Sequence, residues 1–565
     1  MNDNHTYDAI VIGAGMSGGW AAKELCERGL KTLLIERGPD VKHLKDYPTM
    51  NMNPWEFEHR GKISREVQEA NPSISRCYAY REDNQHFFVK DTEHPYIQDK
   101  PFDWIRGYQV GGKSLMWARQ TQRWSDYDFE GPARDGFAVD WPIRYKDLAP
   151  WYTYVERFAG IAGNYDGLDI LPDGEFLPAW GLNCVEQYFQ SSVKQHYKNR
   201  HVIFGRCAHL SEPKEIHRQQ GRGQCMSRRE CERGCPFGGY FNANSTTIPW
   251  AHKTGNLTLR PDSVVQSIIY DDASNKASGI QVIDAKTKES TEYSAKLIFV
   301  NAGAINTIAI LQNSTSDRHP NGLGNDSNTL GRYVAFHNYR ARISAVCEDF
   351  NDQKSKGYRP TSAYIPRFRN VYRQETDFLR GYACGFGAGR YLNRSHKGLG
   401  SELADNIFAK AKLGPWRVGS HMMGETIPKE SNQVYLDKTE VDEWGMPLIH
   451  IDVDYDDNDE KMIKDFQEQL TDMYEKAGFT DIKVEDDHRV PGLDIHEMGG
   501  VRMGRDPETS MLNSWHQLHS CPNVIVSDGA CMTSTATQNP SLTYMAMAAR
   551  AANHAVDELD KGNLL

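Results

Sequence analysis

A glycine-rich turn near the N-terminus limits the fold more than any other part of this 565-residue chain. Residues 7–38 read YDAIVIGAGMSGGWAAKELCERGLKTLLIERG. The apolar run from Ala9 to Ile12 predicts a strand, and the turn after it carries Gly13, Gly15 and Gly18. Helical spacing and a second apolar strand follow. The segment therefore predicts a strand, a tight turn, a helix and a second strand, which is one unit of an α/β fold.

The spacing of the three glycines matches the fingerprint of a dinucleotide site. The first glycine permits a tight turn, the second lets a pyrophosphate approach the backbone, and the third lets helix and strand pack closely. Glu36 ends the second strand, 18 residues after Gly18, where a carboxylate accepts hydrogen bonds from the adenosine ribose. We therefore predict a dinucleotide site, with a glycine turn in another α/β fold as the alternative. The fingerprint does not separate NAD from FAD.

The C-terminal segment indicates which dinucleotide is bound. Residues 521–559 read as a strand ending in SDG at 527–529, a loop of small residues and a long helix. Asn539 and Pro540 favour the start of that helix, because asparagine caps helices and proline suits the first helical position. Unpaired N–H groups and the helix dipole make this end positive. It would stabilise the negative charge of a reduced flavin, whereas a nicotinamide becomes neutral on reduction, so the segment favours a flavin.

Four segments resemble those of the glucose–methanol–choline (GMC) oxidoreductase family, and the similarity covers most of the chain. They are GAGMSG…IERG from residue 13, GYQVGGKSLMWARQTQRWS at 107–125, VNAGAINTIAIL at 300–311, and HEMGGVRMG…VIVSDGACMTSTATQNPSLT from residue 496. The resemblance implies an α/β plus α+β architecture, similar to that of p-hydroxybenzoate hydroxylase, in which a Rossmann-like FAD-binding domain carries an inserted substrate domain on an antiparallel sheet. It implies FAD-binding segments at 1–50, 95–150, 206–330 and 490–565, and substrate-binding and cap segments at 51–94, 151–205 and 331–489.

The resemblance also implies which residues contact the cofactor. Asp528 would lie near the ribityl and phosphate groups. The backbone at Val264 and Val265 would meet the adenine, and Ala302 and Gly303 would pass the adenosine. The other expected contacts are Gly13, Gly15, Met16, Ser17, Gly18, Glu36, Arg37, Gly111, Gly112, Ser114, Met116, Trp117, Gly529, Asn539 and Pro540. Relatives that attach FAD covalently carry a histidine in a GGxSxHW pattern. This chain has methionine at that position, so we expect a non-covalent flavin.

His496 and Asn539 align with the catalytic pair of the family. Oxidising an alcohol with a flavin moves a hydride from carbon to the flavin N5 and the hydroxyl proton to a base. A neutral imidazole suits that proton because its pKa lies near the working pH. The asparagine amide would hold the hydroxyl oxygen and so orient the carbon hydrogen toward the flavin. The structural alternatives are a core histidine at 496 and a simple helix cap at 539.

The resemblance implies a sugar as substrate. The HEMGGVRMG and QNPSLT segments are similar to those of pyranose-oxidising enzymes and of gluconate and glucoside dehydrogenases. MNPWEFEHRG at 52–61 resembles bacterial glucoside 3-dehydrogenases, which oxidise the carbon-3 hydroxyl to a ketone. We therefore expect a dehydrogenase for a secondary pyranose hydroxyl, with carbon 3 preferred. The alternatives are an oxygen-using pyranose or glycoside oxidase without a metal cluster, a gluconate-type 2-dehydrogenase, and a non-enzymatic flavin and iron–sulfur electron carrier.

Three cysteines close together in the sequence, Cys225, Cys231 and Cys235, suggest a metal centre. Five residues separate the first two, three separate the last two, and a proline follows. A structural zinc would need a fourth ligand, and no histidine nearby has finger-like spacing. Cytochrome-linked sugar dehydrogenases that this chain resembles carry a [3Fe–4S] cluster on cysteines with the same spacing. We expect such a cluster, with unligated thiols as the alternative.

The neighbouring arginines, at 222, 228, 229 and 233, predict a solvated face or a docking site for an electron acceptor. By the same resemblance, the expected partners are cytochrome c or another acceptor and a small subunit that bears an export signal. The N-terminus leads almost directly into a strand, so we expect no signal peptide in this chain. The expected location is the cytoplasm, or the periplasm if the chain is exported with its partner.

Charge and cysteine content exclude several classes of protein. The net charge of −11 predicts no nucleic-acid partner. No apolar run approaches the ~20 residues of a transmembrane segment. Eleven cysteines, an odd number scattered along the chain, favour free thiols over a disulfide framework.

Overall fold

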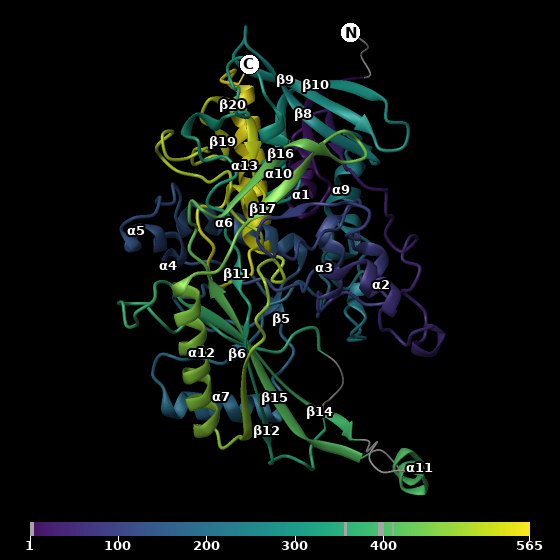
Figure 1. Cartoon of the computed structure of the whole chain (residues 1–565), viewed down its shortest axis with the longest axis vertical. Coiled ribbons are helices and arrows are strands. Elements are labelled where there is room, and N and C mark those ends of the chain that lie inside the picture. The colour runs from purple at the N-terminus through teal and green to yellow at the C-terminus, as the bar shows by residue number, and fades with distance from the viewer. Residues whose placement is uncertain (1–4, 355–358, 394–399, 409–411, 565) are drawn as a thin grey trace.

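The computed structural model describes residues 5–354, 359–393, 400–408 and 412–564. Two large sheets lie toward opposite ends of an elongated molecule (Figure 1). The end that carries both chain termini holds a largely parallel sheet, and the other end holds an antiparallel sheet. This is the predicted combination of α/β and α+β architecture.

The first sheet has eight strands and is parallel at its centre. β1 (Thr6–Ile12) lies between β10 (Ser290–Val300) and β2 (Thr32–Ile35), and all three run in the same direction. β20 (Cys521–Val526) and β7 (Leu257–Arg260) continue the parallel order on either side. The antiparallel strands at the margins are β19 (Gln517–Leu518), β9 (Lys276–Asp284) and β8 (Ser263–Asp271).

Helices cover the parallel strands and explain their apolar sequences. Ala9, Ile10 and Val11 of β1 are fully buried, as expected for a strand covered on both faces. α1 (Met16–Glu27) follows the glycine turn and packs against the long C-terminal helix α13 (Ser541–Asp560). The other helices at this end are α6 (Tyr145–Ala159), α9 (Thr247–Lys253) and α10 (Ala304–Asn313).

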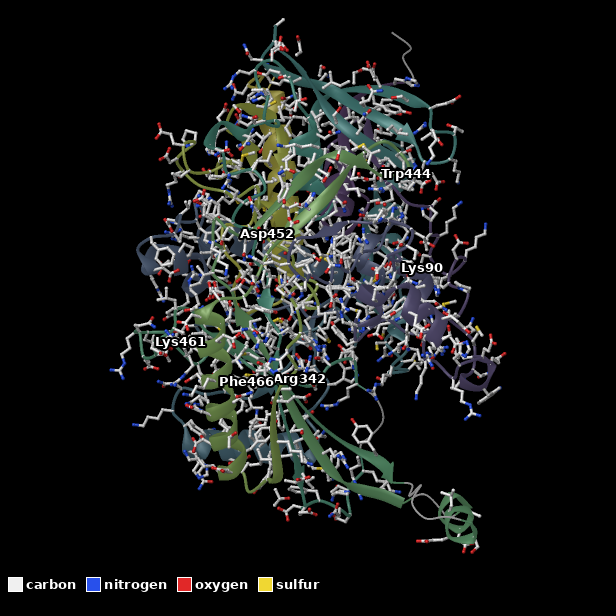
Figure 2. All side chains as sticks on the ribbon, in the orientation of Figure 1. Lys90, Arg342, Trp444, Asp452, Lys461 and Phe466 are labelled. Carbon is white, nitrogen blue, oxygen red and sulfur yellow. The ribbon has the colours of Figure 1, made fainter. Side chains whose placement is uncertain are left out.

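The second sheet has seven strands and is antiparallel throughout. In spatial order they are β18 (Thr480–Asp486), β12 (Ala341–Cys347), β15 (Lys412–Glu425), β14 (Tyr382–Asn393), β13 (Ala363–Ile365) and β6 (Ile203–Phe204), with β11 (His337–Asn338) also beside β15. α12 (Asp457–Lys476) packs on this sheet through buried side chains such as Phe466, and α7 (Cys184–His196) shares the same core (Figure 2). β14 and β15 extend as an arm toward α11 (Ser401–Phe408) (Figure 1).

Smaller elements complete the structure. β3 (Ile97–Gln98), β17 (Pro447–Asp452) and β16 (Gln433–Val441) form a third sheet, and β4 (Ala162–Gly163) pairs with β5 (Leu177–Pro178). The short helices are α2 (Arg65–Ala70), α3 (Pro72–Ser75), α4 (Asp126–Phe129), α5 (Gly131–Asp135) and α8 (Glu215–Gln219). The 3₁₀ turns are η2 (Pro54–Glu56), η3 (Gln85–Phe87), η4 (Gly112–Leu115), η5 (Cys231–Arg233), η6 (Ala243–Ser245), η7 (Asn325–Ser327) and η8 (Gly529–Cys531).

The sequence prediction of the elements differs from the structure at one helix start. α13 begins at Ser541 with Pro540 as its N-cap residue, and Asn539 makes no capping bond. The side chain of Asn539 is turned to a histidine instead, as described below. The domain boundaries proposed above stay a prediction. Within the described ranges, no helix combines the length and apolar character needed to cross a bilayer.

Candidate active site

A cavity of about 450 Å³ opens where the parallel strands end. Its walls include Gly13, Glu36 and Asn301, each of which directly follows the last residue of β1, β2 or β10. Ligands of open α/β sheets bind at these carboxyl ends. Gly385 and His421 of the antiparallel sheet line the same cavity. The cavity therefore reaches from the nucleotide-binding turn to the second sheet.

The three glycines of the turn have distinct surroundings. Gly13 has a φ of +95°, which suits glycine, and a Cβ there would lie 2.4 Å from the Asn301 carbonyl oxygen. A Cβ on Gly18 would lie 1.8 Å from the Gly13 carbonyl oxygen, so helix and turn are in close contact. A Cβ on Gly15 would meet no atom within 4 Å, and Gly15 lines the cavity. The second glycine thus leaves room beside the backbone, as a pyrophosphate requires.

Two buried carboxyl groups frame this part of the cavity. Glu36 accepts hydrogen bonds from the backbone N–H of Ala14 and of Gly38, both at 3.0 Å. Asp528 accepts bonds from the Gly303 N–H at 2.8 Å and the Thr307 hydroxyl at 2.6 Å. Burial raises the pKa of Glu36 to about 7 and that of Asp528 to about 6. Each Glu36 oxygen accepts one of these bonds, and Asp528 Oδ1 accepts only the Ala530 N–H, so these three oxygens each keep a lone pair that a ribose or ribityl hydroxyl could use.

Most of the expected cofactor residues line the cavity, and four do not. Those in the wall are Gly13, Gly15, Met16, Ser17, Glu36, Arg37, Gly112, Met116, Trp117, Val264, Val265, Ala302, Gly303, Asp528, Gly529 and Asn539. The four outside it are Gly18, Gly111, Ser114 and Pro540. The Ser114 hydroxyl donates to the Gly111 carbonyl at 2.5 Å and accepts from the Ala243 N–H at 3.0 Å, which holds the double-glycine turn in place.

The rim of the nucleotide end is built around Arg37. Its guanidinium lies 4.9 Å from the ring centre of Tyr108 and 4.8 Å from that of Trp444, and it pairs with Asp442 at 3.0 Å. Trp444 lies in the turn between β16 and β17 (Figure 2). The sequence analysis did not find Trp444, because the turn that carries it is distant in sequence from the glycine motif.

His496 and Asn539 meet at the cavity wall. Asn539 Nδ2 lies 3.2 Å from His496 Nε2, although 43 residues separate them. On its other side, His496 Nδ1 lies 2.9 Å from Nδ1 of His337, a fully buried residue of β11. Burial holds the pKa of His496 well below its usual value, so the imidazole is neutral near neutral pH. A neutral imidazole next to an amide can accept the proton of a hydroxyl group held between them.

The loop that carries His496 has unusual backbone and electrostatics. Ile495, directly before it, has a φ of +65°, which is strained for a β-branched residue and is common at functional sites. Asp494 is buried, which raises its pKa to about 7, and its Oδ2 lies 3.9 Å from His496 Nδ1. Glu497 pairs with Lys113 at 2.6 Å, and both line the cavity.

The far wall of the cavity is polar and aromatic. The ring centres of Tyr78 and Tyr339 are 6.1 Å apart, and those of Tyr339 and His421 are 5.1 Å apart. Gln120 donates to the Thr361 hydroxyl at 2.9 Å, and both residues line the cavity. The sequence analysis assigned no role to these five residues, which come from five separate parts of the chain.

Cys225, Cys231 and Cys235 are half-buried, and their three sulfur atoms do not all lie within 4.8 Å of one another. None of them lines the cavity, and all eleven cysteines of the chain are free thiols. Burial, together with the smaller effect of the nearby Cys231 and Cys235, raises the pKa of Cys225 to about 11. Arg119 connects the two sites, because it lines the cavity and is electrostatically coupled to Cys231.

The arginines near the cysteines do not form one solvated face. Arg222 and Arg233 are only 2% and 3% exposed, which corrects the prediction from the sequence. Arg222 donates to the carbonyl groups of Gly238 and Ala159, and Arg233 donates to the carbonyl of Met52. These two side chains anchor the cysteine loop to its surroundings, whereas those at 228 and 229 are exposed.

The architecture, the glycine turn and the histidine–asparagine pair define a flavin-dependent alcohol oxidoreductase. Models of the GMC oxidoreductase family match residues 7–338 and 428–548, which is most of the chain. The chain belongs to the GMC oxidoreductase family. It is therefore an FAD-dependent oxidoreductase that acts on CH–OH groups of sugars or other alcohols.

Two relatives and one solved structure illustrate the similarity. The 2-methyl-1,2-propanediol dehydrogenase of Mycolicibacterium austroafricanum is 26% identical over 97% of this chain and 94% of its own. The fructose dehydrogenase large subunit of Gluconobacter japonicus is 26% identical over 99% of this chain and 100% of its own. The formate oxidase of Aspergillus oryzae RIB40, at 12% identity, covers 99% of both chains with a TM-score of 0.59, which shows the shared fold.

Proposed function

We propose that this protein is a dehydrogenase that oxidises a secondary hydroxyl of a pyranose sugar or glucoside. The observation that carries the proposal is the 3.2 Å contact between His496 Nε2 and Asn539 Nδ2 at the wall of the cavity. A hydroxyl oxygen placed against both groups would donate its proton to the imidazole and accept a hydrogen bond from the amide. This arrangement fixes the carbon that bears the hydroxyl.

FAD, when bound, would supply the hydride acceptor of this reaction. His496 is the general base that takes the hydroxyl proton at Nε2. Asn539 holds the hydroxyl oxygen, so that the carbon hydrogen has one orientation in the cavity. Met116, which occupies the position of the covalent attachment in some relatives, is buried in the cavity wall, and its thioether has no hydrogen to lose in forming a neutral bond to the flavin. We therefore propose a non-covalent flavin.

The far wall of the cavity supports a sugar as the substrate. Tyr78 and Tyr339 present aromatic faces on which a pyranose ring can pack. Gln120, Thr361 and His421 offer donors and acceptors for several hydroxyl groups on one face of a sugar. A small apolar alcohol would make none of these hydrogen bonds, so it would gain less binding free energy from this wall than a sugar.

Carbon 3 is the proposed position of oxidation, on the resemblance of residues 52–61 to glucoside 3-dehydrogenases. Turnover of methyl β-D-glucopyranoside with a soluble electron acceptor, followed by NMR of the product, tests the position. The expected product is the 3-keto glucoside. A ketone at any other carbon would refute the choice of carbon 3, and a 2-keto product from gluconate would support a gluconate-type 2-dehydrogenase.

The surroundings of the three cysteines fit an iron–sulfur cluster. Arg119 is 6% exposed, and its Nε and Nη1 atoms have no hydrogen-bond partner. His209 is 1% exposed, its Nε2 lies 3.6 Å from the Cys231 sulfur, and its Nδ1 is unpartnered. Buried donors of this kind are costly unless they face an acceptor or negative charge, and thiolates and sulfides supply both.

The same geometry does not fit one zinc ion. The thiolates of a zinc site lie about 2.3 Å from the metal, so their sulfur atoms are near one another. Among the described residues, one set of three metal-ligating side chains has its ligand atoms within 4.8 Å of one another, and it consists of His337, Asp494 and His496. The three cysteine sulfur atoms are therefore not that close together. A cluster binds each thiolate to a different iron, which places the sulfur atoms farther apart. We therefore propose that Cys225, Cys231 and Cys235 hold a [3Fe–4S] cluster.

The cluster would supply one-electron transfer, which a flavin reduced by two electrons needs when its acceptor takes electrons singly. The likeness to a fructose dehydrogenase large subunit supports a partner subunit for this chain. We propose two kinds of partner: a small subunit that carries the export signal, and cytochrome c or a similar electron acceptor. The location would be the periplasm if this subunit is present.

Iron and acid-labile sulfide per FAD, measured in protein purified without oxygen, test the cluster. Intact protein with flavin and no iron would refute it and favour an oxygen-using oxidase.

A further inference from the structure

We infer that His337 is a positioning residue that selects the tautomer of His496, and so makes Nε2 the basic atom. The inference rests on the proposed function, because it concerns how the base of that reaction is prepared. It follows from two consecutive contacts, which run from the Ala536 carbonyl through His337 to His496.

The first contact fixes the tautomer of His337. Its Nε2 lies 2.6 Å from the carbonyl oxygen of Ala536. A carbonyl oxygen only accepts hydrogen bonds, so Nε2 must carry a hydrogen. The His337 side chain is fully buried, and burial lowers its pKa to about 4. The ring is therefore neutral near neutral pH, and its Nδ1 carries a lone pair.

The second contact transmits this choice to His496. The two Nδ1 atoms lie 2.9 Å apart, and the rings are perpendicular. Because Nδ1 of His337 accepts, Nδ1 of His496 must donate and carries the hydrogen of the neutral ring. The lone pair of His496 is then on Nε2, which faces Asn539 at 3.2 Å. The atom that faces the substrate hydroxyl is thus the atom able to take its proton.

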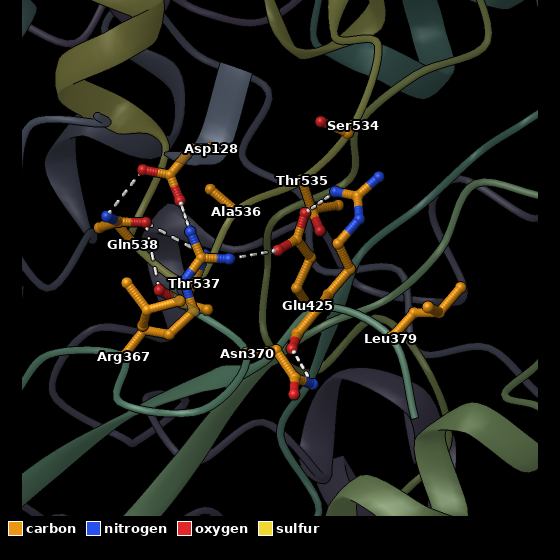
Figure 3. Close-up of polar contacts among 12 residues, drawn as sticks. Asp128, Arg367, Asn370, Leu379, Glu425, Ser534, Thr535, Ala536, Thr537 and Gln538 are labelled. Carbon is orange, nitrogen blue, oxygen red and sulfur yellow. Dashed lines mark hydrogen bonds and ion pairs between the residues drawn. The ribbon is translucent and has the colours of Figure 1, made fainter. Parts of the chain in front are cut away.

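A network of buried ion pairs holds the loop of Ala536 in place (Figure 3). Arg367 lies between Asp128, at 2.7 Å, and Glu425, at 3.4 Å. Gln538, two residues after Ala536, donates to Asp128 at 3.1 Å.

The same network also supports His337. Glu425 ends β15, and its backbone pairs with His337 of β11 in the antiparallel sheet. Both ends of the contact between Ala536 and His337 are therefore attached to one buried network. A rigid support of this kind keeps an orienting hydrogen bond short.

Other ionisable groups face His496 from the elements around it. Asp494 and Glu497 lie on its own loop, and Lys113 comes from the turn η4. Asp494 Oδ2 accepts the backbone N–H of His337 at 2.8 Å. Neither Lys113 nor Glu497 makes a hydrogen bond to the His496 ring that would set its tautomer, since they pair with each other.

Two amide variants separate positioning from simple packing. In His337→Asn, the amide oxygen takes the place of Nδ1 and can accept from His496. In His337→Gln, the longer side chain places the amide near Ala536 and out of reach of His496. His337→Leu removes both hydrogen bonds, and His319→Leu, a buried histidine outside the cavity, is the control for loss of a buried imidazole. The readout is anaerobic flavin reduction by methyl β-D-glucopyranoside in the holoenzyme, as a function of sugar concentration and pH.

The inference predicts that His337→Gln and His337→Leu slow flavin reduction by about tenfold or more, as loss of one orienting hydrogen bond does. In both variants the pH below which flavin reduction slows should move to a lower value. The reason is that the protonated ring of His496 loses the acceptor that stabilises it. His337→Asn restores most of the rate and the wild-type pH dependence, and His319→Leu behaves as the wild type. If His337→Leu does not fold, the Asn and Gln pair decides alone.

Equal rates and pH profiles in the Asn and Gln variants would overturn the inference. A wild-type rate in His337→Leu would do the same. If His496→Ala reduces its flavin as fast as the wild type, or the sugar never reduces the wild-type flavin, the proposed function fails and the inference fails with it.

Discussion

Gly15 and Gly18 lie three residues apart, and alanine is expected to affect a different property at each position. At Gly15 it should lower the affinity for FAD, and at Gly18 it should lower the free energy of unfolding. A Cβ at Gly15 would meet no atom within 4 Å, and the residue has a φ of −79° that alanine adopts without strain. Gly15→Ala should therefore change the free energy of unfolding by less than about 1 kcal/mol. The added methyl group projects into the space that the pyrophosphate needs, so FAD affinity should fall by about tenfold or more, or about 1.4 kcal/mol.

Gly18→Ala should act on the fold itself. Its Cβ would lie 1.8 Å from the Gly13 carbonyl oxygen, whereas ordinary contact begins near 3.4 Å. That oxygen belongs to the backbone, so it cannot rotate away. Alanine gains about 1 kcal/mol of helix propensity over glycine, but overpacking of this kind costs about 1–3 kcal/mol or more. The net effect should be destabilising.

The assay for both variants combines thermal unfolding of the apoprotein with FAD titration by fluorescence. Gly15→Ala should unfold at the wild-type temperature and bind FAD weakly, and Gly18→Ala should unfold at a lower temperature. Wild-type FAD affinity in Gly15→Ala, or an unchanged unfolding temperature in Gly18→Ala, would refute the assignment of roles to these glycines.

Three other predictions follow from the buried charges and the cysteines. Arg380→Met removes one of the two arginines paired with the buried Glu425 and also the ion-pair partner of Asp135, and should lower the free energy of unfolding by about 3–5 kcal/mol; an unchanged urea midpoint would contradict this. Burial raises the pKa of Asp494 from 3.8 to about 7, so folding disfavours its ionised form. As the pH rises between those two values, the free energy of unfolding should therefore fall by about 1.4 kcal/mol per pH unit. In Asp494→Asn the denaturation midpoint should fall less steeply with rising pH than in the wild type, and an equally steep fall would argue against this pKa. Cys231→Ser should lower the iron content without changing the FAD content; equal iron in variant and wild type would argue against Cys231 as a ligand.

The sequence predicted those parts of the site in which neighbouring residues determine the geometry. Gly13, Gly15 and Gly18 have the expected surroundings because a turn and the first turn of its helix are set by local backbone sterics. Glu36 lines the cavity because it follows the strand that pairs with β1. The start of α13 was predicted at Pro540, and the helix begins at Ser541, a difference within the usual uncertainty of helix ends.

Contacts between distant segments were not predictable where no sequence motif marks both partners. His337 lies in a two-residue strand, 159 residues before His496, and no local pattern marks it. Arg222 and Arg233 have the composition of a solvated face and are buried because distant carbonyl groups accept their hydrogen bonds. Burial of a charged side chain depends on tertiary partners, which a one-dimensional pattern does not contain.

The most direct test of the account is anaerobic reduction of the flavin by a glucoside in the wild type and in His496→Ala. The loss of flavin absorbance on mixing with methyl β-D-glucopyranoside measures hydride transfer without any external acceptor. The account predicts reduction in the wild type and a rate lower by about a hundredfold or more in the variant, with FAD content unchanged. An equal rate in both proteins, or no reduction of the wild type by any pyranose, would contradict it.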